Sequence, residues 1–277
     1  MEATESTSSR RDPGHRPVAA VTGGRRGIGQ ACAISLAEAG FDVVIVDLEE
    51  DAGATQTLAN AAEHGARARM VVGNIAEIDH RADLVDRLYQ ALGTVDCLVN
   101  NAGVLSGTRG QDLLNVTPAD FDHVMSVNLR GTFFFTQEVA RRMVGEAAKG
   151  PPAERSIITI SSGAVGRART DSPEYAFSKS CLALMSQMFA LRLGKHGIRT
   201  YEIRPGINRT EMSRDAWGMY EELIAEGRFP IPRLGVPEDV GKTVASLATG
   251  GLAYCTGGHV YVDGGFHIPT SVRPRRN

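Results

Sequence analysis

Short apolar runs rich in β-branched residues alternate with longer segments of helical pattern along this 277-residue chain. Runs that are apolar at almost every position, such as Val43-Val44-Ile45-Val46, are typical of strands buried on both faces. Parallel strands of this kind need helical crossovers, which are right-handed. The pattern therefore predicts an α/β fold with one doubly wound parallel sheet of about seven strands and helices on both faces. The expected strands are Val18–Thr22, Asp42–Asp47, Ala68–Val72, Cys97–Asn100, Ser156–Ser161, Arg199–Arg204 and His259–Val262.

The chain shows no internal linker or repeat that would divide this pattern. We expect one domain over residues 17–269, with flexible tails at residues 1–16 and 270–277, where the sequence is polar and rich in arginine. The stretch Glu146–Arg155 contains Gly150-Pro151-Pro152 and predicts a surface loop that ends a helix.

Composition excludes several classes of function. The 30 Lys and Arg residues nearly balance 32 Asp and Glu residues, so no global field favours nucleic acid or an anionic membrane as a partner. A small-molecule ligand is the favoured partner. No apolar run reaches transmembrane length and no signal peptide is recognisable, so we expect a cytoplasmic protein.

The four cysteines lie far apart in apolar stretches. We expect Cys32, Cys97, Cys181 and Cys255 to be buried thiols packed in the core of a protein from a reducing compartment. No Cys/His spacing resembles a set of metal ligands, so no metal site is expected.

Glycines follow the first expected strand in Thr22-Gly23-Gly24-Arg25-Arg26-Gly27-Ile28-Gly29, and a helical pattern comes next. Glycines at a strand-to-helix turn allow a tight bend and close approach to a pyrophosphate, which rests on the helix N-terminus. This placement predicts a Rossmann-type dinucleotide site that includes Gly23, Arg25, Arg26, Gly27, Ile28 and Gly29.

Asp47 ends the second expected strand, about twenty residues beyond the glycines, where a carboxylate binds the adenosine ribose. The same carboxylate repels a 2′-phosphate by roughly 4 kcal/mol at 4 Å in an effective dielectric of 20. NAD is therefore the preferred cofactor. Arg25 and Arg26 keep NADP open, because a guanidinium near the ribose binds phosphate.

Tyr175 and Lys179 stand four residues apart at the start of a long helical pattern that runs to Leu193. This spacing places the phenol and the ammonium on one face of a helix. A nearby cation favours the phenolate, which makes tyrosine a useful acid or base near neutral pH.

These motifs together resemble the short-chain dehydrogenase/reductase family over Val18 to Ile268. The resemblance rests on Thr22-Gly23-x-x-x-Gly27-Ile28-Gly29, Asn100-Asn101-Ala102-Gly103, Ser162 thirteen residues before Tyr175, Tyr175-x-x-x-Lys179 and Pro205-Gly206. It implies that Ser162 binds the substrate oxygen, that Tyr175 exchanges its proton and that Lys179 also holds the nicotinamide ribose. It further implies that Asn128, in the helical stretch Phe121–Arg142, lies in a kinked helix that holds a water relaying protons from Lys179.

The resemblance also extends the set of cofactor contacts. Asn101, Ala102 and Gly103 would lie beside the ribose, with Asn101 bracing the sheet, and Asn74 would bind the adenine amino group in place of the Asp of many relatives. Pro205, Gly206, Ile207 and Thr210 would hold the nicotinamide carboxamide, with Asn208 where relatives often carry an apolar residue. The remaining expected cofactor contacts are Leu48, Ile75, Tyr175 and Lys179.

Two substrate classes are compatible with the resemblance. Ile231-Pro232-Arg233-Leu234-Gly235 and Val262-Asp263-Gly264-Gly265 resemble segments of 3-oxoacyl-[acyl-carrier-protein] reductases and of NAD-dependent sugar or polyol dehydrogenases. The segment from Glu211 to Pro232 would cover the substrate. A non-catalytic dinucleotide sensor or scaffold is the alternative of another class, although such proteins would be expected to lose Tyr175 or Lys179. Relatives commonly form homotetramers, which we expect here too.

Overall fold

The computed structural model describes residues 16–107, 110, 112–148 and 154–269. The expected tails at residues 1–15 and 270–277 lie outside these ranges, as do residues 149–153 of the expected loop. Arg16, expected to belong to the tail, instead packs on the domain: it donates to the backbone oxygens of Ala37 and Phe41 and pairs with Asp42.

Seven parallel strands form one sheet in the order β3-β2-β1-β4-β5-β6-β7. Their bounds are β1 Val18–Thr22, β2 Asp42–Asp47, β3 Ala68–Val72, β4 Cys97–Asn100, β5 Arg155–Ile160, β6 Ile198–Pro205 and β7 Gly258–Val262. The first four agree with the expected strands, and the other three differ by one residue at one or both ends. The strand order reverses between β1 and β4, which confirms the doubly wound α/β fold and creates a crevice at the carboxyl ends of the strands.

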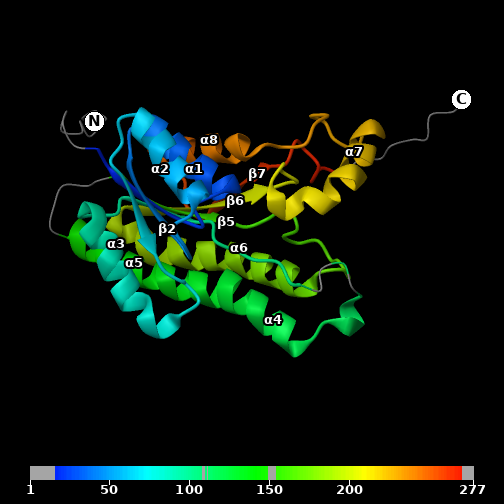
Figure 1. Ribbon diagram of the computed structural model, residues 1–277, viewed down its shortest axis with the longest axis horizontal. Helices are drawn as coiled ribbons and strands as arrows, with labels where there is room; N and C mark the ends of the chain where they lie inside the picture. Colours follow the sequence, from blue (N-terminus) through cyan, green and yellow to red (C-terminus); the bar gives the residue numbers. More distant parts are fainter. Residues whose placement is uncertain (1–15, 108–109, 111, 149–153, 270–277) are drawn as a thin grey trace, which may run out of the picture.

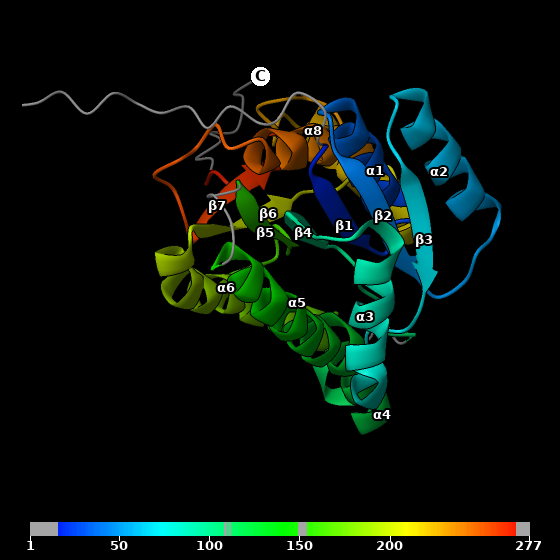
Figure 2. The ribbon, with the colours of Figure 1, turned by 90° about the vertical axis from the view of Figure 1, so that its left-hand side faces the viewer.

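Helices cover both faces of the sheet (Figure 1). One layer holds α1, α2 and α8, and the other holds α3, α5 and α6, as the view in Figure 2 shows. The bounds are α1 Gly27–Glu38, α2 Ala52–Glu63, α3 Arg81–Leu92, α4 Pro118–Met125, α5 Thr132–Ala147, α6 Pro173–Leu193, α7 Trp217–Ala225 and α8 Pro237–Ala248. Short 3-10 turns are η1 Ile78–His80, η2 Leu113–Asn115, η4 Gly194–His196 and η5 Glu211–Ala216.

The central strands divide their side chains between two apolar cores. Ala19 and Val21 of β1 pack under α1 and α8, whereas Val18 and Ala20 pack on the opposite face with residues of α3 and α5. Every residue of β1 is buried, as the continuous apolar runs predicted. The site therefore lies at the carboxyl ends of strands whose centre, β1 and its neighbours β2 and β4, is almost wholly buried.

The cysteine prediction is half wrong. Cys32 and Cys97 are buried free thiols, but Cys181 and Cys255 are exposed. Cys181 lies on α6, which is apolar around its circumference, so an apolar neighbourhood in the sequence did not distinguish the outer face of the helix from the inner one. Cys255 lies in the loop before β7, where Leu252 and Tyr254 are also exposed.

Candidate active site

The glycine turn joins β1 to α1 through a close backbone approach. Gly23 and Gly27 have φ of 67° and 56°, a region that disfavours residues with a side chain. A Cβ on Gly29 would lie 1.9 Å from the backbone oxygen of Gly23, so only glycine fits there. The N-terminal turn of α1 therefore presents bare backbone at the crevice.

Asn101 fastens this turn to the end of β4. Its Nδ2 donates to the backbone oxygens of Thr22 and Gly23, at 3.0 and 3.1 Å. The hydroxyl of Thr22 accepts from the backbone N–H groups of Asn101 and Ala102. Asn101 thus braces the sheet, while the small residues Ala102 and Gly103 border the crevice.

Asp47 lies at the end of β2 beside the glycine turn. Its carboxylate accepts from the backbone N–H groups of Arg25 and Leu48, at 3.1 and 2.8 Å. The guanidinium of Arg25 lies 3.3 Å from the same carboxylate and also pairs with Glu49 and Asp51. The hydrogen bond to Glu49 is the main cause that raises the pKa of Arg25 above its ordinary value, against the opposing effect of burial.

The remaining residues expected near the adenosine differ in their burial and in their hydrogen-bond partners. Asn74 accepts from the backbone N–H of Ala76 through its Oδ1, the atom expected to meet the adenine amino group. Ile75 packs its side chain into the core, whereas Leu48 is 59% exposed. Arg26 turns away from Asp47 and pairs with Glu211 at 2.8 Å, which joins the glycine turn to η5.

Lys179 and Tyr175 project from one face of α6. The buried Nζ of Lys179 donates to the backbone oxygen of Ile160 at 3.1 Å and lies 5.6 Å from the centre of the Tyr175 ring. Burial lowers the pKa of Lys179 from 10.5 to about 8. The helical spacing seen in the sequence therefore does bring the ammonium to the phenol.

Asn128 lies in a π-helical turn, η3 Ser126–Gly131, that separates α4 from α5. The stretch Phe121–Arg142, expected to be one helical stretch with a kink, is thus interrupted at Asn128. Its side chain is fully buried and bonds both backbone groups of Val104, accepting at 2.7 Å and donating at 3.0 Å. A Cβ on Gly103 would lie 3.2 Å from Asn128 Oδ1 and 3.5 Å from Lys179 Nζ. Gly103 therefore lies against both side chains, and a larger residue there would crowd Asn128.

Ser162 follows β5 and lies beside the segment that follows β6. Its hydroxyl accepts from the backbone N–H of Ala164 at 3.0 Å. The next residue, Gly163, donates its N–H to the backbone oxygen of Pro205 at 2.8 Å. Asn208 is buried and donates to the backbone oxygen of Gly206 at 3.1 Å, which fixes the segment that contains Ile207.

The residues around this crevice have the chemistry that a dinucleotide requires. A Cβ on Gly27 would find Thr210 as its nearest neighbour, 3.6 Å away, so the glycine turn and the end of the Pro205–Thr210 segment lie next to each other. Bare N–H groups at the start of α1 suit a pyrophosphate, and Asp47 suits ribose hydroxyls. Among the described residues no cluster of His, Cys, Asp and Glu could hold a metal ion.

Comparison with known proteins identifies the family. The profile described as Enoyl-(Acyl carrier protein) reductase matches residues 23–267. The chain belongs to the short-chain dehydrogenase/reductase family. It is an NAD(P)-dependent oxidoreductase that acts on CH–OH groups.

Curated relatives include sugar and sugar-acid dehydrogenases. L-rhamnose 1-dehydrogenase (NAD(P)(+)) of Sphingomonas sp. (strain SKA58) is 34% identical over 90% of this chain and 95% of that protein. 2-Dehydro-3-deoxy-D-gluconate 5-dehydrogenase of Dickeya dadantii (strain 3937) is 32% identical over 90% of this chain and 94% of that protein. Both matches span almost the whole length of each protein.

Among solved structures, a 3-oxoacyl-[acyl-carrier protein] reductase from Brucella melitensis in complex with NAD is similar. Its TM-score is 0.87 at 40% identity, over 92% of this chain and 99% of that chain. The names of these similar proteins cover sugar, sugar-acid and acyl-thioester substrates, so they agree on the reaction class and differ in substrate.

Two side-chain clusters near the site were not found from the sequence. Arg169 pairs with Asp171 in the loop before α6, and the hydrogen bond to Asp171 is the main cause of its raised pKa, with Tyr220 and Tyr175 adding to it. The second cluster joins Ser161 to Glu202 and Arg204 behind Ser162. The available signal was the charged pair Glu202 and Arg204, two residues apart and therefore on one face of the expected strand.

Proposed function

We propose that this enzyme interconverts a secondary alcohol and a ketone with NAD as its preferred cofactor, and that Tyr175 is the proton-transfer group. One observation carries the proposal: the buried ammonium of Lys179 lies 5.6 Å from the centre of the Tyr175 ring, on the helix that borders the crevice. An ammonium at this position favours the phenolate form of Tyr175 and so supports proton exchange.

The proposed roles follow from the arrangement of the side chains. The bound nicotinamide cofactor supplies the chemistry of hydride transfer. Ser162 holds the substrate oxygen by hydrogen bonding while Tyr175 takes or gives the proton at that oxygen. Lys179 also holds the nicotinamide ribose. Asn128, fixed to Val104 in the π-helical turn, holds open the path by which a water carries protons between Lys179 and solvent.

The cofactor contacts form a second part of the proposal. Gly23, Gly27 and Gly29 hold the pyrophosphate on α1, Asp47 binds the adenosine ribose, and Asn101 keeps the turn in place. The contacts proposed to complete the site are Arg25, Arg26, Ile28, Leu48, Asn74, Ile75, Ala102, Gly103, Pro205, Gly206, Ile207 and Thr210.

Preference for NAD rests on the charges around Asp47. Of the two arginines that could bind a 2′-phosphate, Arg25 is engaged by the carboxylates of Asp47, Glu49 and Asp51, and Arg26 pairs with Glu211. Arg25 and its three carboxylate partners together carry a net negative charge where the phosphate would lie. Repulsion between like charges and the engaged guanidinium both disfavour NADP.

We infer that a 3-oxoacyl thioester is the first substrate class to test. The supporting observation is the likeness to the 3-oxoacyl-[acyl-carrier protein] reductase structure, which covers 92% of this chain at 40% identity. A sugar, sugar acid or polyol is the second class, supported by the relatives that act on L-rhamnose and 2-dehydro-3-deoxy-D-gluconate.

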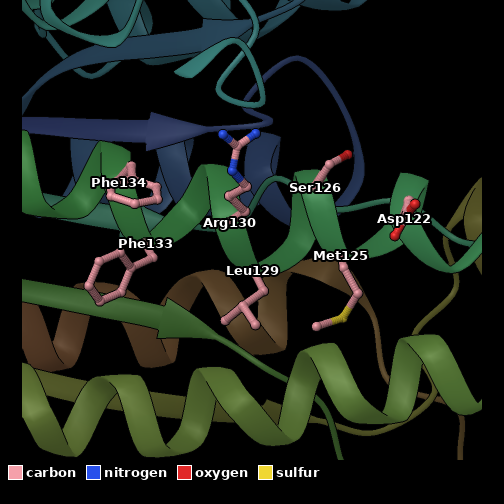
Figure 3. Close-up of a pocket in the computed structure, with 7 residues that line it drawn as sticks. All are labelled: Asp122, Met125, Ser126, Leu129, Arg130, Phe133 and Phe134. Atoms are coloured by element: carbon pink, nitrogen blue, oxygen red, sulfur yellow. The ribbon is translucent and has the colours of Figure 1, made fainter. Parts of the chain in front are cut away.

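We also infer a homotetramer. An apolar stripe on α6, formed by Phe177, Leu184, Met188 and Leu191, is more than half exposed at each residue. A groove next to it continues the apolar surface, and Figure 3 shows its lining residues projecting from α4, η3 and α5. These are Asp122, Met125, Ser126, Leu129, Arg130, Phe133 and Phe134. Apolar surface of this extent favours pairing of α5 and α6 with a second copy.

The remaining parts of the proposal concern organisation and compartment. Residues 17–269 act as one catalytic unit. All four cysteines are free thiols, which supports the cytoplasm as the compartment. In the described part of the chain, no helix is long and apolar enough to cross a membrane.

A cofactor-absorbance screen tests the proposed function. The purified enzyme is assayed with NADH and NADPH on acetoacetyl thioesters, and with NAD and NADP on L-rhamnose, gluconate-type sugar acids and polyols. Turnover that is lost in Tyr175→Phe supports the proposal. Binding of NADH without turnover of any compound would instead support a dinucleotide sensor or scaffold.

A further inference from the structure

A buried polar network lies directly behind the proposed catalytic serine. Glu202 on β6 is 3% exposed, and its carboxylate accepts from the Ser161 hydroxyl at 2.5 Å. The guanidinium of Arg204 binds the same carboxylate with two hydrogen bonds, at 2.8 and 3.0 Å. Ser161 precedes Ser162 in the chain, so this contact fixes the backbone that carries the proposed catalytic hydroxyl.

The network continues to β7. Arg204 donates from Nη1 to the hydroxyl of Tyr261 at 2.9 Å. The Tyr261 ring stacks on the ring of His267, with centroids 3.8 Å apart, and His267 Nδ1 lies 2.9 Å from the carboxylate of Asp263. Asp263 also accepts from the backbone N–H groups of Gly265 and His267. The chain of contacts therefore connects the carboxyl ends of β5, β6 and β7.

The hydrogen-bonded network adjoins the Pro205–Gly206 segment, proposed to face the nicotinamide, at both of its ends. Pro205 follows Arg204 directly, and its backbone oxygen accepts from Gly163, the residue after Ser162. Gly206 packs against Asp263 so closely that a Cβ would lie 2.7 Å from the Cβ of Asp263. A shift of the Glu202–Arg204 pair would therefore move both the backbone at Ser162 and the backbone at Pro205.

The energetics argue against a purely stabilising role. The Glu202 and Arg204 side chains are only 3% and 12% exposed, so both charges have left water. Replacement of such buried pairs by apolar residues of similar volume is often neutral or stabilising. Burying this network costs free energy, yet its hydrogen bonds are well formed. Its role is therefore better explained by the fixed positions that it gives to the neighbouring backbone segments.

We propose that Glu202 and Arg204 are positioning residues: through Ser161 and Tyr261 they set the distance between Ser162 and the Pro205–Gly206 segment that faces the nicotinamide. This inference rests on the proposed roles of those two elements. Neither Glu202 nor Arg204 touches the substrate or the cofactor in this account. Their effect is confined to the geometry in which the proton and the hydride move.

The test uses an apolar replacement of the whole pair. Glu202→Leu/Arg204→Met removes both charges without leaving one uncompensated. We expect the midpoint of thermal unfolding to stay the same or rise, while kcat falls about tenfold to hundredfold, as for a catalytic group displaced by about 1 Å. The effect should depend on Ser162: in a Ser162→Ala background the same pair of substitutions should lower kcat less than about threefold.

Two further variants separate positioning from stability. Ser161→Ala removes one hydroxyl and keeps the ion pair, so it folds even if the double replacement does not, and kcat should still fall. Asp42→Asn is the matched control, because Asp42 is a buried carboxylate paired with Arg67 at the opposite end of the sheet. It should lower the unfolding midpoint and leave kcat within about twofold.

A measurement without turnover keeps this inference distinct from the proposed function. Crystal structures of the wild type and of Glu202→Leu/Arg204→Met should differ by a displacement of Ser162 Oγ relative to the Pro205 oxygen, and NADH affinity measured by fluorescence should weaken. If the wild type turns over no compound, the proposed function fails, and these two readouts still decide the inference. Superposable sites with unchanged NADH affinity, or an undiminished kcat, would overturn it.

Discussion

The Nζ of Lys179 donates to the backbone oxygen of Ile160 at 3.1 Å and lies 5.6 Å from the centre of the Tyr175 ring. Ile160 ends β5, and Ser161 and Ser162 follow it, so this lysine joins the helix that carries the phenol to the strand that carries the serine. The ammonium is buried at that junction, which lowers its pKa to about 8. The charge of Lys179 in the folded protein therefore changes around pH 8.

The pH dependence of stability should report this burial. Between the pKa of about 8 in the folded protein and the ordinary 10.5, the unfolded chain holds the Lys179 proton and the folded chain does not. Stability from this group therefore rises with pH through that window, and the full cost of burying the charge, about 3 kcal/mol, is present below it. Urea denaturation at pH 7 and pH 10 measures the change.

Lys179→Met is the reference for this measurement, because it lacks the titrating ammonium. The contributions of all other titrating groups to the free energy of unfolding are the same in both proteins and cancel in the difference. The free energy of unfolding of the wild type, relative to Lys179→Met, should increase from pH 7 to pH 10. A difference between the two proteins that stays constant or decreases over this range would contradict the burial of a charged Lys179.

Cofactor preference should respond to the carboxylates that engage Arg25. Glu49→Gln/Asp51→Asn removes two negative charges and releases the guanidinium from two of its three carboxylate partners. The amide introduced at position 51 can still cap α2 as the Asp51 carboxylate does. We expect the ratio of kcat/KM for NADP to that for NAD to rise about tenfold, which corresponds to about 1.4 kcal/mol.

Arg25→Ala in the same background is the control for this gain. It should abolish the increase if the released guanidinium binds the 2′-phosphate. Equal efficiency of the wild type with NAD and NADP would instead show that Asp47 and its neighbours do not select the cofactor.

The packing of α1 on α8 should tolerate no side chain at Gly241. A Cβ there would lie 2.5 Å from the backbone oxygen of Ala31 and 2.6 Å from Ser35 Oγ, so the helices would have to separate. Gly241→Ala should cost about 1–3 kcal/mol of unfolding free energy. Gly145→Ala, in α5 with nothing within 4 Å of its Cβ, should stabilise by up to about 1 kcal/mol. Equal effects of the two substitutions would refute this packing.

The apolar stripe on α6 should mediate assembly. Light scattering of the wild type should give the mass of four chains, and Leu184→Glu/Leu191→Glu should reduce it, because charges would be buried between copies. Ala59→Glu, on the exposed face of α2 in the opposite layer, should leave the mass unchanged. A monomeric wild type would exclude the tetramer.

The sheet could be predicted from the sequence because each strand and turn is marked by residues within one short stretch of the chain. Continuous apolar runs such as Val43–Val46 mark a strand buried on both faces, and the glycines before α1 mark the turn at the crevice. Tyr175 and Lys179 could be paired because a helix fixes their relative position at four residues apart.

What the sequence could not predict depends on contacts between distant segments. The side chain of Asn128, in the π-helical turn, is hydrogen-bonded to the backbone of Val104, 24 residues away in the chain. Arg25 is held by Glu49 and Asp51, which belong to the loop after β2. The exposure of Cys181 on an apolar helix depends on which face meets the sheet. None of these relations follows from spacing within one segment.

The proton-transfer role of Tyr175 is tested most directly by one comparison. Tyr175→Phe removes a single hydroxyl from α6, and its kcat/KM is measured on the compound that the wild type turns over fastest, together with NADH affinity by fluorescence. We expect a loss of about a thousandfold in kcat/KM, with NADH affinity within about threefold of the wild type. Retention of more than about a tenth of the wild-type kcat/KM would contradict it.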